Sequence, residues 1–280
     1  RWDGLEAIRQ LKQLDDALES DEEMQAFVSK LESIQQKLAA APRELLLVGE
    51  AEQLAPMQQA FMGHFDAAEG LKLDASIKPY APRIDSAVVK DGWLTSTQVN
   101  FCSKAYAAVP ADHEDSAPFT VLSGYLRNSF LHTAIREKGG AYGGGASYDG
   151  DAGAFRFYSY RDPRLAETLT DFDASLEWLM KDDDEHEPRL LEEAILGVIG
   201  ALDRPRSPAG EAVGAYYMLR NGRTPEQRRR FRQRILSVTL EDLRRVAQQY
   251  LKPELANTAV ISDPGQKTTV TEMGLTPEHV

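Results

Sequence analysis

The sequence predicts an α+β fold, a sandwich in which one mostly antiparallel sheet carries helices on one face, with a helical pair before it. Two observations support this. Segments with the alternation of β-strands are interleaved with long segments of helical periodicity, and apolar residues make up 42% of the 280 positions. The chain is therefore long enough and apolar enough to bury a sizeable core.

The amino-terminal segment is expected to be a helical pair. Over residues 3–40 apolar side chains recur at steps of three and four, with a break around Ser20. Ser20 and Glu23 have the spacing of a capping box at the start of the second helix, and Pro42 ends it. The pair has an apolar stripe and no core of its own, so we expect it to dock on another surface.

The remaining elements follow from periodicity and turn residues. We expect β segments at 44–49, 86–90 and 97–109, a helix at 51–65, and a Pro-rich stretch at 78–83. A long helix is expected at 118–137, followed by a hairpin at 141–160 with its turn at 149–153. Five helices should follow, and then a last strand at 258–261 before a polar tail; the helices are 163–181, 188–202, 208–221, 225–236 and 239–250.

Composition argues against several classes of function. The net charge of −12 disfavours nucleic acid as a partner, and the basic run at 228–234 has the spacing of a solvated helix face. No apolar stretch is long enough to predict a membrane helix, so no membrane partner is expected. The single cysteine, Cys102, excludes an internal disulfide and fits a reducing compartment, the cytoplasm or an organelle matrix.

The sequence predicts no metal site and no cofactor within this chain. Its five histidines form neither HxxEH nor HExxH, the patterns that place two imidazoles one helical turn apart beside a carboxylate. No G-x-S-x-G motif occurs, and Cys102 lies in a strand pattern that favours a buried, inert thiol.

One glycine-rich segment brings polar side chains into a suggestive order. A long helix is expected to end near Arg136, Gly139 and Gly140 permit a sharp turn, and a strand then begins with Tyr142. A guanidinium and a phenol so placed can reach one peptide carbonyl together. A helix C-cap with a surface arginine and a packing tyrosine explains the same pattern, and both interpretations stay open on this evidence.

The segment from Phe130 to Leu169 resembles the last domain of presequence proteases, in the pitrilysin/insulinase clan of zinc metallopeptidases. The family's Arg–x5–Tyr pair matches Arg136 and Tyr142. The resemblance implies that these two residues hold the substrate and polarise the scissile carbonyl. Residues 1–41 then correspond to the tail of the preceding family domain, and residues 42–280 to the carboxy-terminal domain. Substrate-binding roles are also expected in this segment, for Gly139, Gly140, Tyr160 and Arg161.

The resemblance further implies a protein of two homologous halves that close around a peptide chamber. Zinc and its glutamate base belong to the amino-terminal half, so this chain's expected partners are that half and peptide substrates. The isolated chain is expected to be inactive. The alternative is a clan homologue without zinc, acting as a peptide-binding or structural subunit; an α+β peptide-binding domain unrelated to proteases is the third hypothesis.

Overall fold

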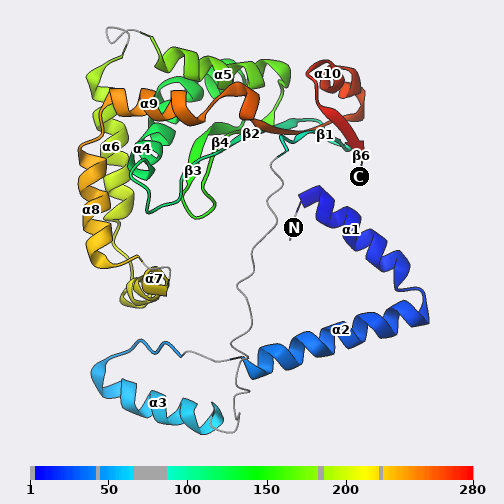
Figure 1. Ribbon diagram of the computed structural model, residues 1–280, viewed down its shortest axis with the longest axis vertical. Helices are drawn as coiled ribbons and strands as arrows, with labels where there is room; N and C mark the ends of the chain where they lie inside the picture. Colours follow the sequence, from blue (N-terminus) through cyan, green and yellow to red (C-terminus); the bar gives the residue numbers. More distant parts are fainter. Residues whose placement is uncertain (1–3, 42–44, 66–86, 182–185, 221–222, 280) are drawn as a thin grey trace. The chain divides into compact units, whose positions relative to one another are not determined.

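The computed structural model describes residues 4–41, 45–65, 87–181, 186–220 and 223–279, with the side chains of 63–65 left out (Figure 1). Contacts within the chain divide it into two units, residues 1–85 with 205–222 and residues 86–204 with 223–280. The expected family boundary at residues 41/42 stays a prediction. The described helices include none that is both long and apolar enough to cross a membrane. The Pro-rich stretch at 78–83 lies outside the described residues.

The first unit contains helices, whose bounds are α1 Gly4–Ala17, α2 Asp21–Ala40, α3 Ala51–Phe65 and α7 Pro208–Arg220. The amino-terminal helical pair is confirmed. The capping box is wrong, because the Ser20 side chain makes no cap hydrogen bond; only its carbonyl accepts the amide of Met24. The predicted strand at 44–49 is also wrong for the residues described there, 45–49, which pair with no described strand.

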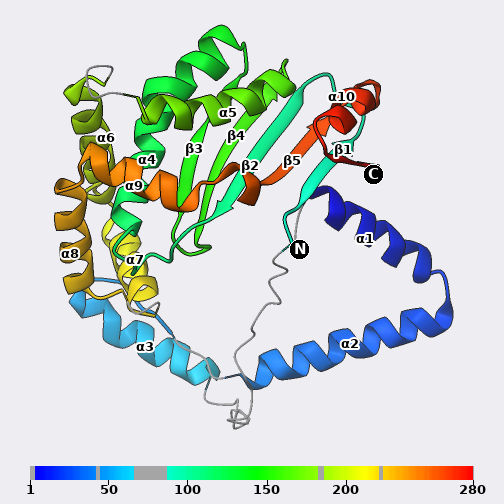
Figure 2. The ribbon, with the colours of Figure 1, turned by 45° about the horizontal axis from the view of Figure 1, so that its top comes forward.

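The second unit contains one six-stranded sheet, ordered β3-β4-β2-β5-β1-β6 (Figure 2). The pairs β3–β4, β4–β2 and β2–β5 are antiparallel, while β1 runs parallel to both β5 and β6. The hairpin and the strands predicted at 97–109 and 258–261 are confirmed. The bounds are β1 Lys90–Leu94, β2 Asn100–Ala107, β3 Gly143–Asp149, β4 Ala154–Asp162, β5 Asn257–Ser262 and β6 Thr276–His279.

Two predictions at the β1 edge of the sheet need correction. The strand expected at 86–90 begins only at Lys90, and the expected polar tail instead forms helix α10 and strand β6. Val270 is fully buried and packs where a Cβ on Gly92 would lie, and Leu275 is buried as well. These two apolar side chains fold the tail back onto the sheet.

The helices of the second unit cover one face of the sheet, as predicted for the fold class (Figure 2). In β2 the buried side chains alternate with half-buried ones, and Cys102, Lys104 and Tyr106 belong to the covered face. The helix bounds are α4 Ser116–Leu126, η1 Arg127–Lys138, α5 Ala166–Leu179, α6 Pro188–Leu202, α8 Pro225–Leu236, α9 Leu240–Tyr250, η3 Pro253–Leu255, η4 Pro264–Gln266 and α10 Lys267–Glu272.

One of these helices differs in kind from its prediction. The helix expected at 118–137 begins as α4 and continues as η1, a π-helix of 12 residues. Between the helices and the sheet lies an aromatic core in which Phe157 of β4 stacks on Phe172 of α5 and Phe119 of α4 stacks on Tyr148 of β3. Burial raises the pKa of the Cys102 thiol to about 12, which fits the predicted inert thiol.

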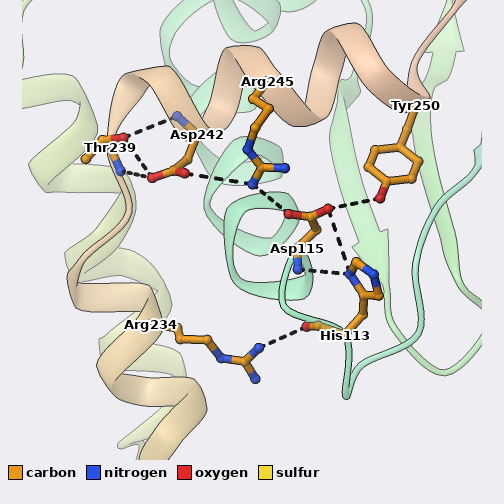
Figure 3. A network of polar contacts seen from close by, with 7 residues as sticks. All are labelled: His113, Asp115, Arg234, Thr239, Asp242, Arg245 and Tyr250. Atoms are coloured by element: carbon orange, nitrogen blue, oxygen red, sulfur yellow. Dashed lines mark hydrogen bonds and ion pairs between the residues drawn. The ribbon is translucent and has the colours of Figure 1, made fainter.

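A polar network anchors the start of α4 to α9 (Figure 3). The buried Asp115 carboxylate accepts hydrogen bonds from Arg245 Nη2 at 2.6 Å and from the Tyr250 hydroxyl at 2.9 Å. His113 Nδ1 accepts the Asp115 backbone amide at 3.1 Å and lies 3.8 Å from the Asp115 carboxylate. The network therefore fixes the position from which α4 runs into η1.

Candidate functional site

An open hollow of about 560 Å³ lies beside β3, the strand at one end of the sheet order. Part of its lining comes from η1 and part from the β3–β4 hairpin and the residue before it. The lining residues are Arg127, Asn128, His132, Arg136, Tyr142, Gly143, Gly144, Tyr158 and Tyr160. Two of them, Arg136 and Tyr142, are the pair for which the family resemblance implies a catalytic role, and that role stays a prediction.

The π-helical winding of η1 determines which of its side chains reach the hollow. Arg127, His132 and Arg136 follow one another at steps of five and four residues. In an α-helix of 3.6 residues per turn, nine residues make about two and a half turns, which places the first and last on opposite sides. The i→i+5 hydrogen bonding of a π-helix lengthens each turn, so that nine residues make roughly two turns. The three side chains therefore share one face.

Two glycines of β3 allow η1 to pack this closely. A Cβ on Gly144 would lie 2.6 Å from Ile135 Cγ2, and one on Gly145 would lie 2.6 Å from Arg127 Cγ. Any larger residue at either position would push η1 away from the strand. The glycine run thus serves the packing of the helix and supports the stem of Arg127 at the hollow.

The end of η1 is fixed by a second set of contacts. Arg164 Nη2 donates to the Ala134 carbonyl at 3.0 Å and to Asp171 Oδ2 at 2.9 Å. Gly139 is buried against this guanidinium, which leaves no room for a Cβ. Gly140 has a φ of +79°, a conformation that glycine adopts without strain, and it turns the chain toward Tyr142.

Few contacts hold Arg136 and Tyr142 themselves. Arg136 Nη1 lies 3.4 Å from His132 Nε2, and His132 Nδ1 lies 3.4 Å from Glu137 Oε1. An arginine only donates hydrogen bonds, so His132 Nε2 is the acceptor in this contact. The Tyr142 side chain is 71% exposed, and its ring meets Tyr160 edge-on with 5.9 Å between centroids. Both functional groups are therefore open to a ligand.

The remaining predicted site residues lie around this pair. Tyr160 lines the hollow and also packs edge-on against Phe101. Arg161 lies over the Tyr160 ring at 5.6 Å, has a φ of 50°, and accepts the Tyr142 amide with its carbonyl. Gly139, Gly140 and Arg161 are not among the lining residues. Their substrate-binding roles stay predictions.

Sequence reasoning predicted no site role for six residues that line the hollow: Gly143 and Gly144, and the side chains of Arg127, Asn128, His132 and Tyr158. A helical period of 3.6 residues places Arg127 on the side of the helix opposite Arg136, so the sequence did not predict that the two side chains line one hollow. The glycine pair at 144 and 145 was the available signal, because such a run in a strand marks a close approach of another segment.

The described residues do not fit a zinc ion. They contain no group of three or more His, Cys, Asp or Glu side chains that could hold a metal. His132 contacts Glu137 and Arg136, and His186 is buried between Tyr125 and Trp178. Both imidazoles therefore already contact other side chains, and the cationic guanidinium beside His132 disfavours a bound metal cation there.

Comparison with solved structures defines the fold. A protease from Helicobacter pylori aligns with a TM-score of 0.58 at 18% identity, over 75% of this chain and 52% of that one. The inactive domain of an M16 peptidase from Pseudomonas fluorescens aligns with a TM-score of 0.52 at 17% identity, over 74% and 50%. At these identities the likeness concerns the fold alone, which is that of the α+β domains of M16 peptidases.

The sequence then gives the family. The profile of the PreP C-terminal domain matches residues 90–261, more than half of the chain. The mitochondrial presequence protease of Yarrowia lipolytica is 42% identical over 171 residues, 61% of this chain and 17% of its own length. That of Eremothecium gossypii is 30% identical over 266 residues, 89% of this chain and 25% of its own. The chain belongs to the PreP C-terminal domain family, which confirms the resemblance, and it spans a quarter or less of these relatives.

Proposed function

We propose that this chain is the carboxy-terminal part of a zinc metalloendopeptidase that degrades short unstructured peptides. One observation carries the proposal. Arg136 and Tyr142 come from the end of η1 and the residue before β3, and both line one open hollow with their polar groups exposed. A helix cap with a packing tyrosine would instead require the Tyr142 ring to be buried, whereas 71% of this residue is exposed.

In this proposal Arg136 and Tyr142 bind the carbonyl oxygen of the peptide bond that is cleaved. The guanidinium and the phenol both donate hydrogen bonds to that oxygen. As the carbonyl carbon becomes tetrahedral, negative charge develops on the oxygen and both hydrogen bonds strengthen. Tyr160 supports the Tyr142 ring, and Gly139 and Gly140 act through the turn that brings the pair together.

The zinc ion of such an enzyme belongs, in this proposal, to the amino-terminal half of the full-length protein. That half is then the principal partner of this chain. The isolated 280-residue chain should bind no stoichiometric zinc and hydrolyse no peptide, which elemental analysis and a peptide-cleavage assay measure directly. We also place the protein in an organelle matrix, since the relatives above are named as mitochondrial proteases; fractionation of cells tests this.

The decisive experiment is kinetic and uses the full-length protein with an unstructured peptide. Tyr142→Phe removes one donor and keeps the ring, so kcat should fall on the order of 10²–10³-fold. Arg136→Lys should also lower kcat, because an ammonium does not reproduce the planar fork of arginine. Tyr217→Phe is the matched control, since Tyr217 is a 62% exposed tyrosine on α7 and does not line the hollow.

Melting temperatures of the same variants separate a catalytic from a packing role. Since Tyr142 is mostly exposed, the catalytic role predicts an unchanged melting temperature together with the loss of kcat. Wild-type turnover in Tyr142→Phe would remove the proposed role of that hydroxyl. A full-length protein that binds peptides, retains no zinc and never cleaves the peptides would establish the alternative, a non-catalytic clan homologue without zinc.

A further inference from the structure

The hollow is positively charged in a chain whose net charge is −12. Its lining includes two arginines, Arg127 and Arg136, and no aspartate or glutamate. Elsewhere, arginines pair with carboxylates, as in Arg232–Asp203 at 2.7 Å and Arg245–Asp115 at 2.6 Å. A local reversal of charge beside a candidate active site indicates an anionic ligand.

Arg127 has no carboxylate partner among the described residues. Within the described part of the chain, its one side-chain hydrogen bond runs from Nε to the Asn128 side-chain oxygen at 3.3 Å, and Arg136 contacts only His132. A guanidinium has five donors, so most of those on Arg127 are open to a ligand. Arg127 contacts the side-chain oxygen of Asn128, so the amide nitrogen of the same side chain is a second hydrogen-bond donor beside the guanidinium.

The position of Arg127 is constrained, although its guanidinium is exposed. Its stem lies against Gly145, so closely that a Cβ there would overlap it. Arg136 lies nine positions after Arg127 in η1, which at the rise of an α-helix corresponds to about 13.5 Å along the helix axis at most. An extended peptide advances about 3.3 Å per residue, so this distance corresponds to about three to four peptide residues.

We propose that Arg127, with Asn128 beside it, binds a carboxylate of the peptide substrate about three to four residues from the carbonyl held by Arg136. The carboxylate belongs to an acidic side chain or to the carboxy-terminus of the peptide, since the guanidinium binds either in the same way. Arg127 is then a specificity-determining residue rather than a catalytic one. The inference rests on the proposed function, because it takes Arg136 as the residue that holds the scissile carbonyl.

The test uses the full-length protein and a set of unstructured peptides of one parent sequence. Each peptide has a single glutamate at one of the positions three to four residues on either side of the cleaved bond, and a matched peptide has glutamine there. Free and amidated carboxy-termini distinguish the second source of the carboxylate. For each pair the ratio of kcat/KM values is measured for the wild type, Arg127→Gln, Arg127→Lys and the control Arg230→Gln, an exposed arginine on α8.

The wild type should favour the acidic member of one pair by about 5- to 20-fold, between the values expected for a hydrogen bond to a charged group and for a fully exposed ion pair. Arg127→Gln should bring this ratio to one, Arg127→Lys should keep part of it, and Arg230→Gln should leave it unchanged. A ratio that is the same in the wild type and in Arg127→Gln overturns the inference.

Failure of the proposed function gives a different result. If the wild type cleaves none of the peptides, or if Arg136→Lys leaves every kcat/KM value unchanged, the assignment of Arg136 fails. Fluorescence anisotropy then measures the dissociation constants of the same labelled pairs. An acidic preference that vanishes in Arg127→Gln supports the carboxylate site even then, and equal affinities for both members of every pair overturn it.

Discussion

Replacement of Asp115 by asparagine should destabilise the sheet-containing unit more than the loss of an exposed ion pair does. Asp115 is 3% exposed and accepts hydrogen bonds from Arg245 and Tyr250 (Figure 3). Asparagine has nearly the same shape, but its amide nitrogen would face one of these donors. A hydrogen bond to a charged group contributes about 1.5–3 kcal/mol. Because Arg245 stays partly in water, we expect a loss of about 2–3 kcal/mol in the free energy of unfolding.

Differential scanning calorimetry of the 280-residue chain measures this loss. For a unit of this size, 2–3 kcal/mol corresponds to a decrease of about 5–10 °C in Tm. The matched control is Asp203→Asn, which breaks the Asp203–Arg232 pair, since both of these side chains are about half exposed. Water replaces the lost contacts in the control, so its Tm should stay close to that of the wild type.

The pH dependence of the same difference has a definite sign. Burial alone would raise the pKa of Asp115, but hydrogen bonds from Arg245 and Tyr250 outweigh it and hold this pKa below the usual aspartate value. A lowered pKa means that the stabilisation is complete above the unfolded value of about 3.9 and is lost as the pH falls through the folded value. The Tm difference between Asp115→Asn and the wild type should therefore be constant from pH 8 to pH 5 and shrink in stronger acid. A difference no larger than that of Asp203→Asn at pH 7 would refute the reasoning.

Two further predictions concern the packing around the site. Gly144→Ala should cost about 1–3 kcal/mol of stability, because the new Cβ pushes Ile135 away. Gly143→Ala should be tolerated, since its Cβ would meet only Tyr160 Cβ at 3.9 Å. Thermal unfolding of both variants checks this, and equal Tm values would contradict it. Cys102, whose pKa burial raises to about 12, should react with an aromatic disulfide reagent at pH 8 about 100-fold or more slowly in the native chain than in denaturant. Rapid stoichiometric labelling of the native chain would show that the strand opens.

Local sequence patterns were enough to predict the helices whose start and periodicity are both encoded within their own residues. The bounds of α6 and α8 match their predictions, because Pro at the start of each helix and apolar periodicity within it are both local signals. The elements that failed depend on distant partners. The predicted strand at 44–49 has the composition of a strand but no ladder partner among the described strands, while β6 has Pro277 within it and exists because β1 pairs with it.

The same distinction explains what could be predicted of the site. Arg136 and Tyr142 flank a glycine turn that sequence makes visible, and their spacing matches a family motif. Arg127 could not be connected with them, since α-helical periodicity separates it from Arg136 by about half a turn. Whether a helix winds as α or π depends on its packing, and here that packing lies against glycines at 144 and 145.

These glycines therefore relate the fold to the proposed specificity. With side chains at 144 and 145, η1 would have to move away from β3. The π-helical winding would then lose the close contact with the strand against which it packs. Arg127 and Arg136 would then face different directions, as they would in an α-helix. A full-length protein carrying Gly145→Ala should consequently lose the preference for acidic peptides while keeping Arg127 itself, since the new Cβ displaces the stem of that arginine. The glycine run, which is simple to read as a flexible turn, is in this interpretation the surface that sets the distance between the two guanidinium groups.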